Sequence, residues 1–102
     1  MRDLYHPRLE DVGLANVLHA LSDPVRLEIV RVLAGLEEVA CSSLNATVSK
    51  STMSHHFKVL REAGVTHTRA NGTKRMMSLR RDELDERFPG LLDSILQSSK
   101  AA

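Results

Sequence analysis

Hydrophobic residues recur at helical spacing at the start of the chain and again after residue 23. The first run predicts a helix over residues 9–21, with apolar positions at Leu9, Val12, Leu14, Val17, Leu18 and Leu21. The second helix is expected to begin at Asp23, whose side chain can cap it, and at Pro24, which fits the first helical position. It should end near Ala34, because Gly35 is a typical helix stop. Its broad apolar side predicts the most buried helix of the domain.

The stretch from Ser49 to Gly64 predicts a short helix with two different faces. Ser49 can cap its start, and Gly64 tolerates the left-handed conformation just past a helix end. Met53, Phe57 and Leu60 fall at i, i+4 and i+7 and predict one buried stripe. The opposite face carries Ser51, Ser54, His55 and Lys58.

This polar face has no acid in its first two turns, and most of its side chains are short. Short side chains allow close approach to another surface, and hydroxyls and imidazoles can bind phosphates or base edges. The pattern therefore favours a helix that lies in a DNA groove; the alternative is an ordinary polar surface helix. Upstream, Cys41 to Ala46 predicts a short helix and Thr47-Val48 a turn, which together give a helix-turn-helix arrangement.

After Gly64 the pattern changes from helix to strand. Residues 65–69 and 74–79 are β-prone and flank the stretch 70–73, where Asn71-Gly72 is a strong hairpin signal. Arg69, Lys74 and Arg75 lie near the expected tip, where they could reach a nucleic-acid backbone. The alternative is a solvated hairpin whose cations protect an exposed sheet edge.

The last helical region is expected to be capped by Asp82 and interrupted at Pro89-Gly90, either as a kink or as two short helices. Its apolar face comprises Leu84, Phe88, Leu91, Leu92, Ile95 and Leu96. The first and last helices thus carry more apolar surface than one copy is expected to bury, which favours pairing across a two-fold axis.

At 102 residues the chain is expected to form one domain, and its net charge of +1 is unevenly distributed. Residues 1–49 carry −3, residues 50–81 carry +7, and residues 82–102 carry −3. A basic central segment on an acidic body is typical of a nucleic-acid binder, the alternative being chance clustering. We find no signal peptide or membrane span, and expect a cytoplasmic protein without membrane contact.

The single cysteine, Cys41, excludes an internal disulfide framework. It could act as a redox switch at a helix N-terminus, but a small packed hydrophobe is the favoured interpretation. A hydrolase built on Cys41 is disfavoured, because no Gly-rich turn or nucleophile motif surrounds it. We therefore expect neither enzymatic activity nor a cofactor.

Two strings, LSDPVRLEIV at residues 21–30 and KSTMSHHFKVLREAG at residues 50–64, resemble the ArsR/SmtB-type winged-helix repressors. The resemblance covers roughly residues 9–97. It implies a homodimer paired through the first and last helices, Ser54 and His55 facing base edges, and the hairpin as a wing. Two features depart from the family: the stretch 44–48 is short and lacks Gly, and one Cys with no His after His67 predicts no metal site.

The sequence therefore predicts a mainly α winged helix-turn-helix with a small β-hairpin, in one domain spanning residues 1–102. Residues 1–8 should be an irregular lead-in and residues 98–102 a flexible tail. The predicted function is sequence-specific repression through double-stranded DNA, on an inverted-repeat operator; the alternative is a protein-interaction module that does not bind DNA.

Residue roles follow from these predictions. The base-reading residues are expected to be Ser51, Ser54 and His55, and the backbone contacts Lys50, Thr52, Lys58, Arg69, Lys74 and Arg75. The dimer interface is assigned to Leu9, Val12, Val17, Leu84, Phe88, Leu91, Leu92 and Ile95. His56 lies off the outer face by its helical phase, so a packing or phosphate role is favoured over base reading.

Overall fold

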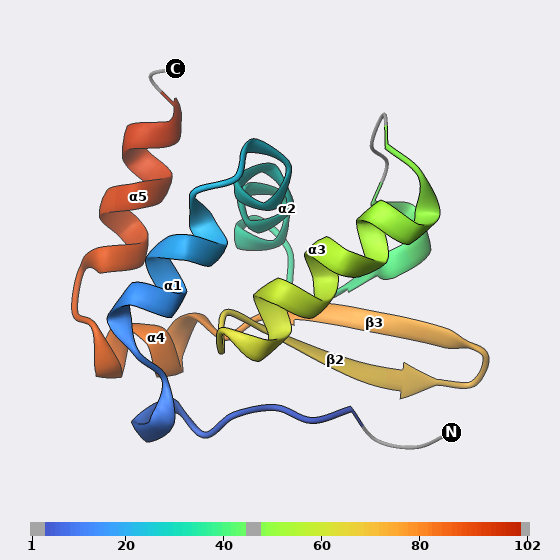
Figure 1. The fold of residues 1–102 in the computed structure, drawn as a ribbon, viewed down its shortest axis with the longest axis horizontal. Helices are drawn as coiled ribbons and strands as arrows, with labels where there is room; N and C mark the ends of the chain where they lie inside the picture. Colours follow the sequence, from blue (N-terminus) through green and yellow to red (C-terminus); the bar gives the residue numbers. More distant parts are fainter. Residues whose placement is uncertain (1–3, 45–47, 101–102) are drawn as a thin grey trace.

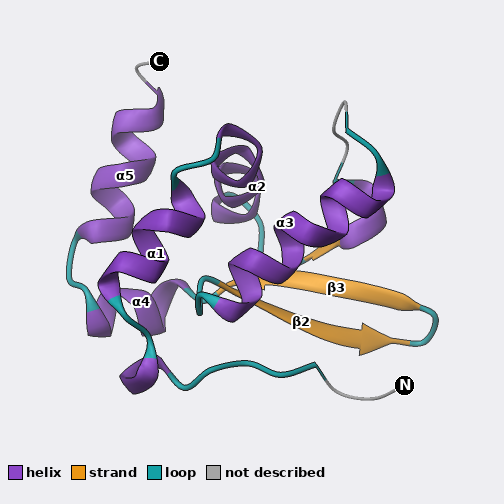
Figure 2. Ribbon diagram, viewed as in Figure 1, coloured by secondary structure: helices purple, strands orange, loops and turns teal. Residues whose placement is uncertain are grey.

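The computed structural model describes residues 4–44 and 48–100 of the chain. In chain order its elements are α1 (Leu14–Leu21), α2 (Pro24–Ala34), β1 (Val39–Ala40), α3 (Lys50–Glu62), β2 (Thr66–Asn71), β3 (Lys74–Leu79), α4 (Arg81–Arg87) and α5 (Leu91–Lys100). Short 3-10 turns occupy Leu9–Asp11 and Cys41–Ser43. The prediction of a mainly α winged helix with a small hairpin is confirmed (Figure 2).

The start of the first helix differs from the prediction. Instead of one helix over residues 9–21, a 3-10 turn is followed by extended backbone at Val12 and Gly13, and α1 begins only at Leu14. Gly13 costs helix stability, and the extended backbone accompanies a Val12 side chain that is only 4% exposed and lies in the core. Tertiary packing of Val12 therefore overrides the helical periodicity.

Helix α2 begins and ends as predicted. The Asp23 carboxylate accepts hydrogen bonds from the amides of Val25 (2.8 Å) and Arg26 (3.1 Å), and Pro24 occupies the first turn. The bond from the Arg26 amide, followed by that from Val25, lowers the pKa of the Asp23 carboxyl. The helix ends at Gly35 and buries Ile29, Val30 and Leu33. Its position at the centre of the fold follows from this apolar side.

The sheet contains one strand that the sequence did not predict. Its order is β1-β3-β2, all antiparallel, with Val39 opposite Met77 and Ala40 opposite Met76. Strands β2 and β3 form the predicted hairpin, and Gly72, at φ +65°, begins a two-residue turn between Asn71 and Lys74. The turn is therefore shorter than the stretch 70–73, because the strands extend farther toward the tip.

The C-terminal region forms two helices that separate at Pro89-Gly90, as one of the two expected outcomes. The predicted cap at Asp82 was wrong: α4 begins at Arg81 with Arg80 at the cap position, and Asp82 lies in the first turn. Helix α5 continues through residues 98–100, which we had expected to be a tail; residues 101–102 lie outside the described part.

One apolar core joins these elements. Among its most buried side chains are Val17, Val30, Leu33, Leu60 and Met77, contributed by α1, α2, α3 and β3. Figure 1 shows α3 beside the hairpin and α5 on the far side of α1. The core thus determines which side of α3 faces solvent.

No helix in the described part of the chain is long and apolar enough to span a membrane.

Candidate nucleic-acid interface

Helix α3 is fastened at both ends. The Ser49 hydroxyl accepts a hydrogen bond from the Thr52 amide at 3.2 Å, so the predicted cap is confirmed. At the other end, the Val65 amide donates to the Leu60 carbonyl at 3.0 Å and the Gly64 amide to the Arg61 carbonyl at 3.1 Å. This pair of bonds, with Gly64 at φ +82°, is a Schellman motif.

The two faces of α3 separate as predicted. Met53 and Leu60 are buried and Phe57 is half-buried, whereas Ser51, Ser54, His55 and Lys58 are exposed. The Ser51 and Thr52 hydroxyls lie 3.1 and 3.0 Å from the Ser49 hydroxyl, in a small cluster at the helix start. Within the described residues, no side-chain hydrogen bond involves Ser54 or His55, so both can bind an external partner.

His56 lies on the inner side of α3, and its side chain is 7% exposed. Its Nδ1 atom is 3.2 Å from Nη1 of Arg26, which is also buried. Of the two roles left open for His56, packing or phosphate binding, its burial against Arg26 favours packing. Sequence reasoning missed Arg26, although a charged residue next to the apolar side of α2 was a signal that it needs a buried partner.

The wing, defined here as the β2–β3 hairpin (residues 66–79), exposes Lys74 and Arg75 near its tip. Arg69 behaves differently, because its guanidinium holds both carboxylate oxygens of Glu38 at 2.6 and 2.7 Å. This hydrogen-bonded pair raises the pKa of Arg69 and lowers that of the Glu38 carboxyl. A phosphate would therefore have to compete with Glu38 for the guanidinium of Arg69.

Other cations of the basic segment are paired as well. Arg80 binds Glu83 at 2.9 Å and Arg81 binds Asp93 at 2.9 Å. In the ion pairs formed by the described residues, Lys50, Lys58, Lys74 and Arg75 take no part. The positive charge available to a partner therefore lies on α3 and at the tip of the wing.

The lead-in, residues 4–8, is irregular as predicted but is attached to the wing. The Thr68 amide donates to Nε2 of His6 at 3.0 Å, and the His6 ring stacks on His67 with centroids 4.3 Å apart. Nη1 of Arg80 donates to the Pro7 carbonyl at 2.8 Å. Because Nε2 of His6 must be unprotonated to accept, this attachment requires a neutral His6.

Acidification is therefore expected to weaken the attachment of the lead-in. Burial lowers the pKa of His6 from 6.5, and the charges of His67, Arg80 and Arg61 act in the same direction. The unfolded chain thus binds a proton at higher pH than the folded chain. The contribution of this contact to stability should be complete above pH 6.5 and decline as the pH falls below it toward the lower folded pKa.

Urea unfolding at about pH 7.5 and about pH 5.5, either side of the ordinary histidine range, measures this decline. A His6→Gln variant keeps an acceptor but cannot titrate, so its stability should decline less over the same interval. An equal decline in both proteins would assign the effect to another group.

Cys41 lies half-buried in the 3-10 turn before α3. Burial raises the pKa of its thiol, and the opposing effect of Arg75 is smaller. A redox switch would need a lowered thiol pKa, so the structure favours the packed-hydrophobe interpretation. The predicted short helix reaches only Ser43, and residues 45–47 of the predicted turn lie outside the described residues.

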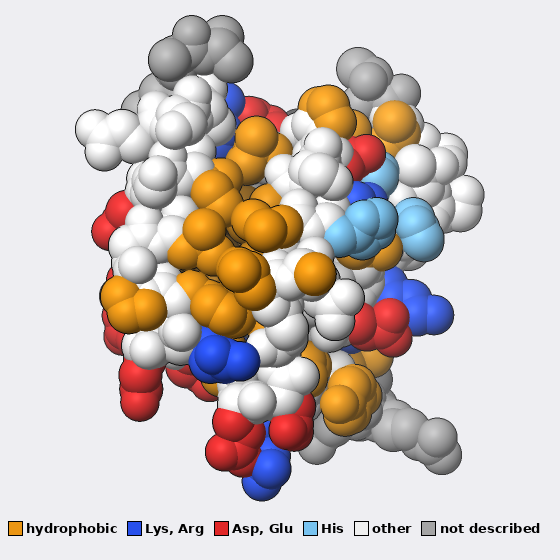
Figure 3. Space-filling model, turned by 60° about the vertical axis from the view of Figure 1, so that its left-hand side comes forward, with side chains coloured by type: hydrophobic (Ala, Val, Ile, Leu, Met, Phe, Trp, Pro, Cys, Tyr) orange, Lys and Arg blue, Asp and Glu red, His pale blue; other side chains and the backbone are white. Residues whose placement is uncertain are grey.

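The residues assigned to the dimer interface divide into two groups. Val12, Val17, Leu84 and Leu92 are at most 4% exposed and belong to the core of one chain, so they have little surface to offer a partner. Leu9, Phe88, Leu91 and Ile95 are only partly buried. Figure 3 shows hydrophobic side chains gathered on the face formed by α1 and α5. On α1, Leu14 and Leu18, which are not among the residues assigned to the interface, are 46% and 44% exposed.

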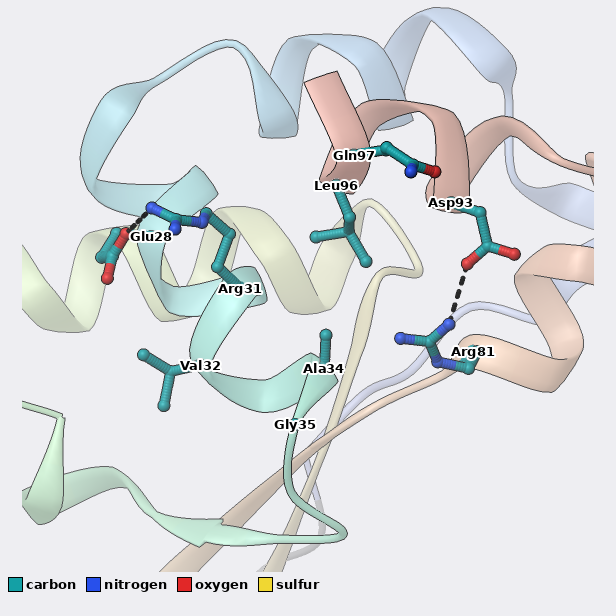
Figure 4. A pocket seen from close by; sticks show the side chains of 9 residues that line it. All are labelled: Glu28, Arg31, Val32, Ala34, Gly35, Arg81, Asp93, Leu96 and Gln97. Carbon is teal, nitrogen blue, oxygen red and sulfur yellow. Dashed lines mark hydrogen bonds and ion pairs between the residues drawn. The ribbon is translucent and has the colours of Figure 1, made fainter. Parts of the chain in front are cut away.

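A groove of about 590 Å³ lies between α2 and α5 (Figure 4). Its apolar floor includes Val32, Ala34 and Leu96, and each side carries an ion pair, Glu28 with Arg31 (2.8 Å) and Arg81 with Asp93 (2.9 Å). These charged groups already satisfy one another, and none of them belongs to the residues assigned to DNA. The groove is thus separate from the candidate interface.

The described residues contain no group of three or more His, Cys, Asp or Glu side chains placed to hold a metal ion. The neighbouring His55 and His56 rings are tilted by 52°, with centroids 6.0 Å apart. One ring faces solvent and the other faces Arg26, so the two do not converge on one ion.

Comparisons with known proteins agree with this geometry. A helix-turn-helix domain family matches residues 21–69. The chain is 39% identical over 89 residues to an uncharacterized HTH-type transcriptional regulator, YceK, of Bacillus subtilis, covering 84% of this chain and 89% of that protein. It is 42% identical over 73 residues to the arsenical resistance operon repressor of Staphylococcus xylosus, covering 71% of this chain and 70% of that protein.

A solved structure extends the similarity to the whole fold. An ArsR-like transcriptional regulator from a Rhodococcus species superposes with a TM-score of 0.65 at 26% identity, covering 86% of this chain and 84% of that one. These proteins are regulators of transcription and not enzymes. With the exposed polar face of α3 and the basic wing, these similarities show that the chain belongs to the ArsR/SmtB-type winged helix-turn-helix family of DNA-binding transcriptional regulators.

Proposed function

We propose that this regulator represses transcription as a homodimer that places two copies of α3 in successive major grooves. The observation that carries the proposal is the exposed hydroxyl-and-imidazole face of α3, with cations at both its ends and on the wing beside it. Two-fold symmetry of the protein predicts an operator that is an imperfect inverted repeat. Its half-sites should lie about one helical turn apart.

The contacts divide into two kinds. Ser51, Ser54 and His55 would discriminate among bases, because their hydroxyl and imidazole groups can bind base edges in the major groove. Lys50, Thr52, Lys58, Lys74 and Arg75 would bind phosphates, and the charged members of this set would supply the salt-dependent part of the affinity. Arg69 is left out of the proposed set because Glu38 holds its guanidinium.

A second copy is the proposed occupant of the apolar face on α1 and α5. Leu14 and Leu18, one helical turn apart, would pack against the partly buried Phe88, Leu91 and Ile95 of the same face and their equivalents in the partner. Isologous pairing of this face would keep both copies of α3 available to one duplex.

The Staphylococcus xylosus relative is named for repressing an arsenical resistance operon. We carry over to this chain the repressor role, and with it the cytoplasmic location of a protein that acts on the chromosome. We do not carry over the response to arsenic. A thiolate site takes at least two or three cysteines, and this sequence has one.

Selection of bound sequences from random duplexes tests the proposal in one experiment. An enriched inverted repeat with half-sites about one turn apart is expected. Enrichment of a single unpaired half-site, or of nothing at any salt concentration, would contradict it.

Two substitutions test the division of contacts. His55→Ala should reduce the preference for operator over scrambled duplex by about tenfold or more, with nearly unchanged salt dependence. Arg75→Ala should weaken both duplexes alike and reduce the salt slope by about one per protomer. Fluorescence anisotropy over a salt series measures both quantities, and Glu62→Ala, an exposed change at the end of α3, is the control. The same outcome from both substitutions would refute the division.

A further inference from the structure

Three helices meet at one buried guanidinium, that of Arg26 at the start of α2. Its Nε donates to the Ala20 carbonyl at 2.7 Å and its Nη2 to the His19 carbonyl at 3.2 Å, both near the end of α1. Its Nη1 lies 3.2 Å from Nδ1 of His56 on α3. Arg26 is 7% exposed, and no carboxylate of the described residues forms an ion pair with it. Its direct partners are instead the C-terminal carbonyls of α1, and the Asp23 carboxylate acts on its charge without forming an ion pair.

We propose that Arg26 and His56 are positioning residues that set the rotation of α3 about its own axis and thereby determine how well the regulator distinguishes one DNA sequence from another. The proposal rests on base reading by α3, as proposed above, and adds the device that orients the reading side chains.

The chemistry of arginine sets which atom of this contact donates and which accepts. An arginine side chain only donates, so Nδ1 of His56 must be the acceptor and its ring proton must be on Nε2. The contact therefore needs a neutral His56 in one tautomer. The charged and titratable groups that act on it are the guanidinium of Arg26 and the Asp23 carboxylate, both at the start of α2, and the ring of His55 on its own helix.

Apolar packing alone would fix the rotation of α3 about its axis less closely than a hydrogen bond does. Met53 and Leu60 bury their side chains beneath the helix, but burial of apolar surface is non-directional and tolerates small rotations. A planar guanidinium already fixed by two carbonyls of α1 leaves its third contact little freedom. His56 follows His55 directly, so a change in the rotation of α3 at His56 also displaces the proposed base reader.

Two substitutions at His56 separate positioning from packing. Asparagine can present its side-chain oxygen close to the position of Nδ1, whereas leucine fills similar space without an acceptor. We expect His56→Asn to retain discrimination between the selected operator and a scrambled duplex within about threefold, and His56→Leu to lose at least about tenfold. Affinity for the scrambled duplex and its salt slope should stay within about twofold in both variants, because the phosphate contacts remain.

A double-mutant cycle then tests whether Arg26 acts through His56. Arg26→Lys keeps the charge but replaces the planar guanidinium with a single ammonium group. As a single substitution it should reduce discrimination between operator and scrambled duplex, but it should add little to the loss caused by His56→Leu. Arg26→Lys also carries the test if the leucine variant does not fold. Unchanged discrimination in His56→Leu, equal losses in the asparagine and leucine variants, or additive losses in the cycle would overturn the proposal. A wild-type protein without operator preference would instead refute the proposed base reading itself.

Discussion

Replacing Gly64 with alanine is expected to lower the free energy of unfolding by about 2–4 kcal/mol, the sum of a backbone cost and a packing cost. Gly64 has φ +82°, a left-handed conformation that disfavours every residue with a β-carbon. A β-carbon built there would overlap Cγ2 of Val12, so either the backbone at residue 64 or the Val12 side chain would have to move. Val12 is buried and β-branched, so its side chain has few other rotamers that would relieve the overlap.

Gly72 provides a matched control for this prediction. It also has a positive φ, of 65°, but a β-carbon there would meet no atom within 4 Å. Gly72→Ala should therefore show only the backbone cost, of about 1–2 kcal/mol. Urea unfolding of both variants at one protein concentration isolates the packing cost. Adding Val12→Ala to the Gly64 variant removes the clashing methyl groups and should make the two changes less than additive.

Equal losses for Gly64→Ala and Gly72→Ala would contradict the prediction, because the contact with Val12 would then contribute nothing. A loss of 2–4 kcal/mol is a large part of the stability of a domain of this size, about 5–15 kcal/mol. Gly64 lies between the C-cap of α3 and the start of β2, so its left-handed backbone is part of the connection between α3 and the wing.

Local chemistry made several features predictable from the sequence. Asp23, Ser49 and Gly64 were assigned as helix boundaries because a cap or a left-handed stop depends mainly on the residue and its near neighbours. The Asn71-Gly72 pair located the hairpin for the same reason. The exposed face of α3 followed from a simple helical period, since Met53 and Leu60 could be buried only if Ser54 and His55 were not.

Features set by distant partners were missed. Strand β1 has two residues, too few to show a period, and exists because Val39 and Ala40 pair with β3. The pairing of Arg69 with Glu38 joins residues 31 positions apart, and the contact of Arg26 with His56 joins residues 30 apart. Hydrophobic periodicity likewise identified the apolar stripes of the first and last helices. It could not tell which side chains one chain buries by itself, so the interface assignment included core residues such as Val17.

The exposed leucines of the first helix lead to the second large effect. Leu18→Glu is expected to dissociate the proposed dimer and to weaken operator binding by about a hundredfold or more, since linked binding of two half-sites is lost. Leu18 is 44% exposed in one chain, so a single chain can accommodate a carboxylate there, whereas a dimer paired through α1 would have to bury it. Sedimentation equilibrium measures the association, and anisotropy with duplexes carrying one or two half-sites measures binding. The variant should bind both duplexes with similar, weak affinity.

Leu36→Glu makes the same chemical change at a residue that is 54% exposed and lies in the turn after α2, outside both α1 and α5. It should leave both the association and the operator affinity close to those of the wild type. This comparison distinguishes a specific interface from a general dependence on surface leucines. A Leu18→Glu protein that remains dimeric, or a Leu36→Glu protein that dissociates, would show that the two copies pair through a different surface. The operator spacing expected from pairing through α1 and α5 would then no longer follow, because that spacing depends on which face relates the two copies of α3.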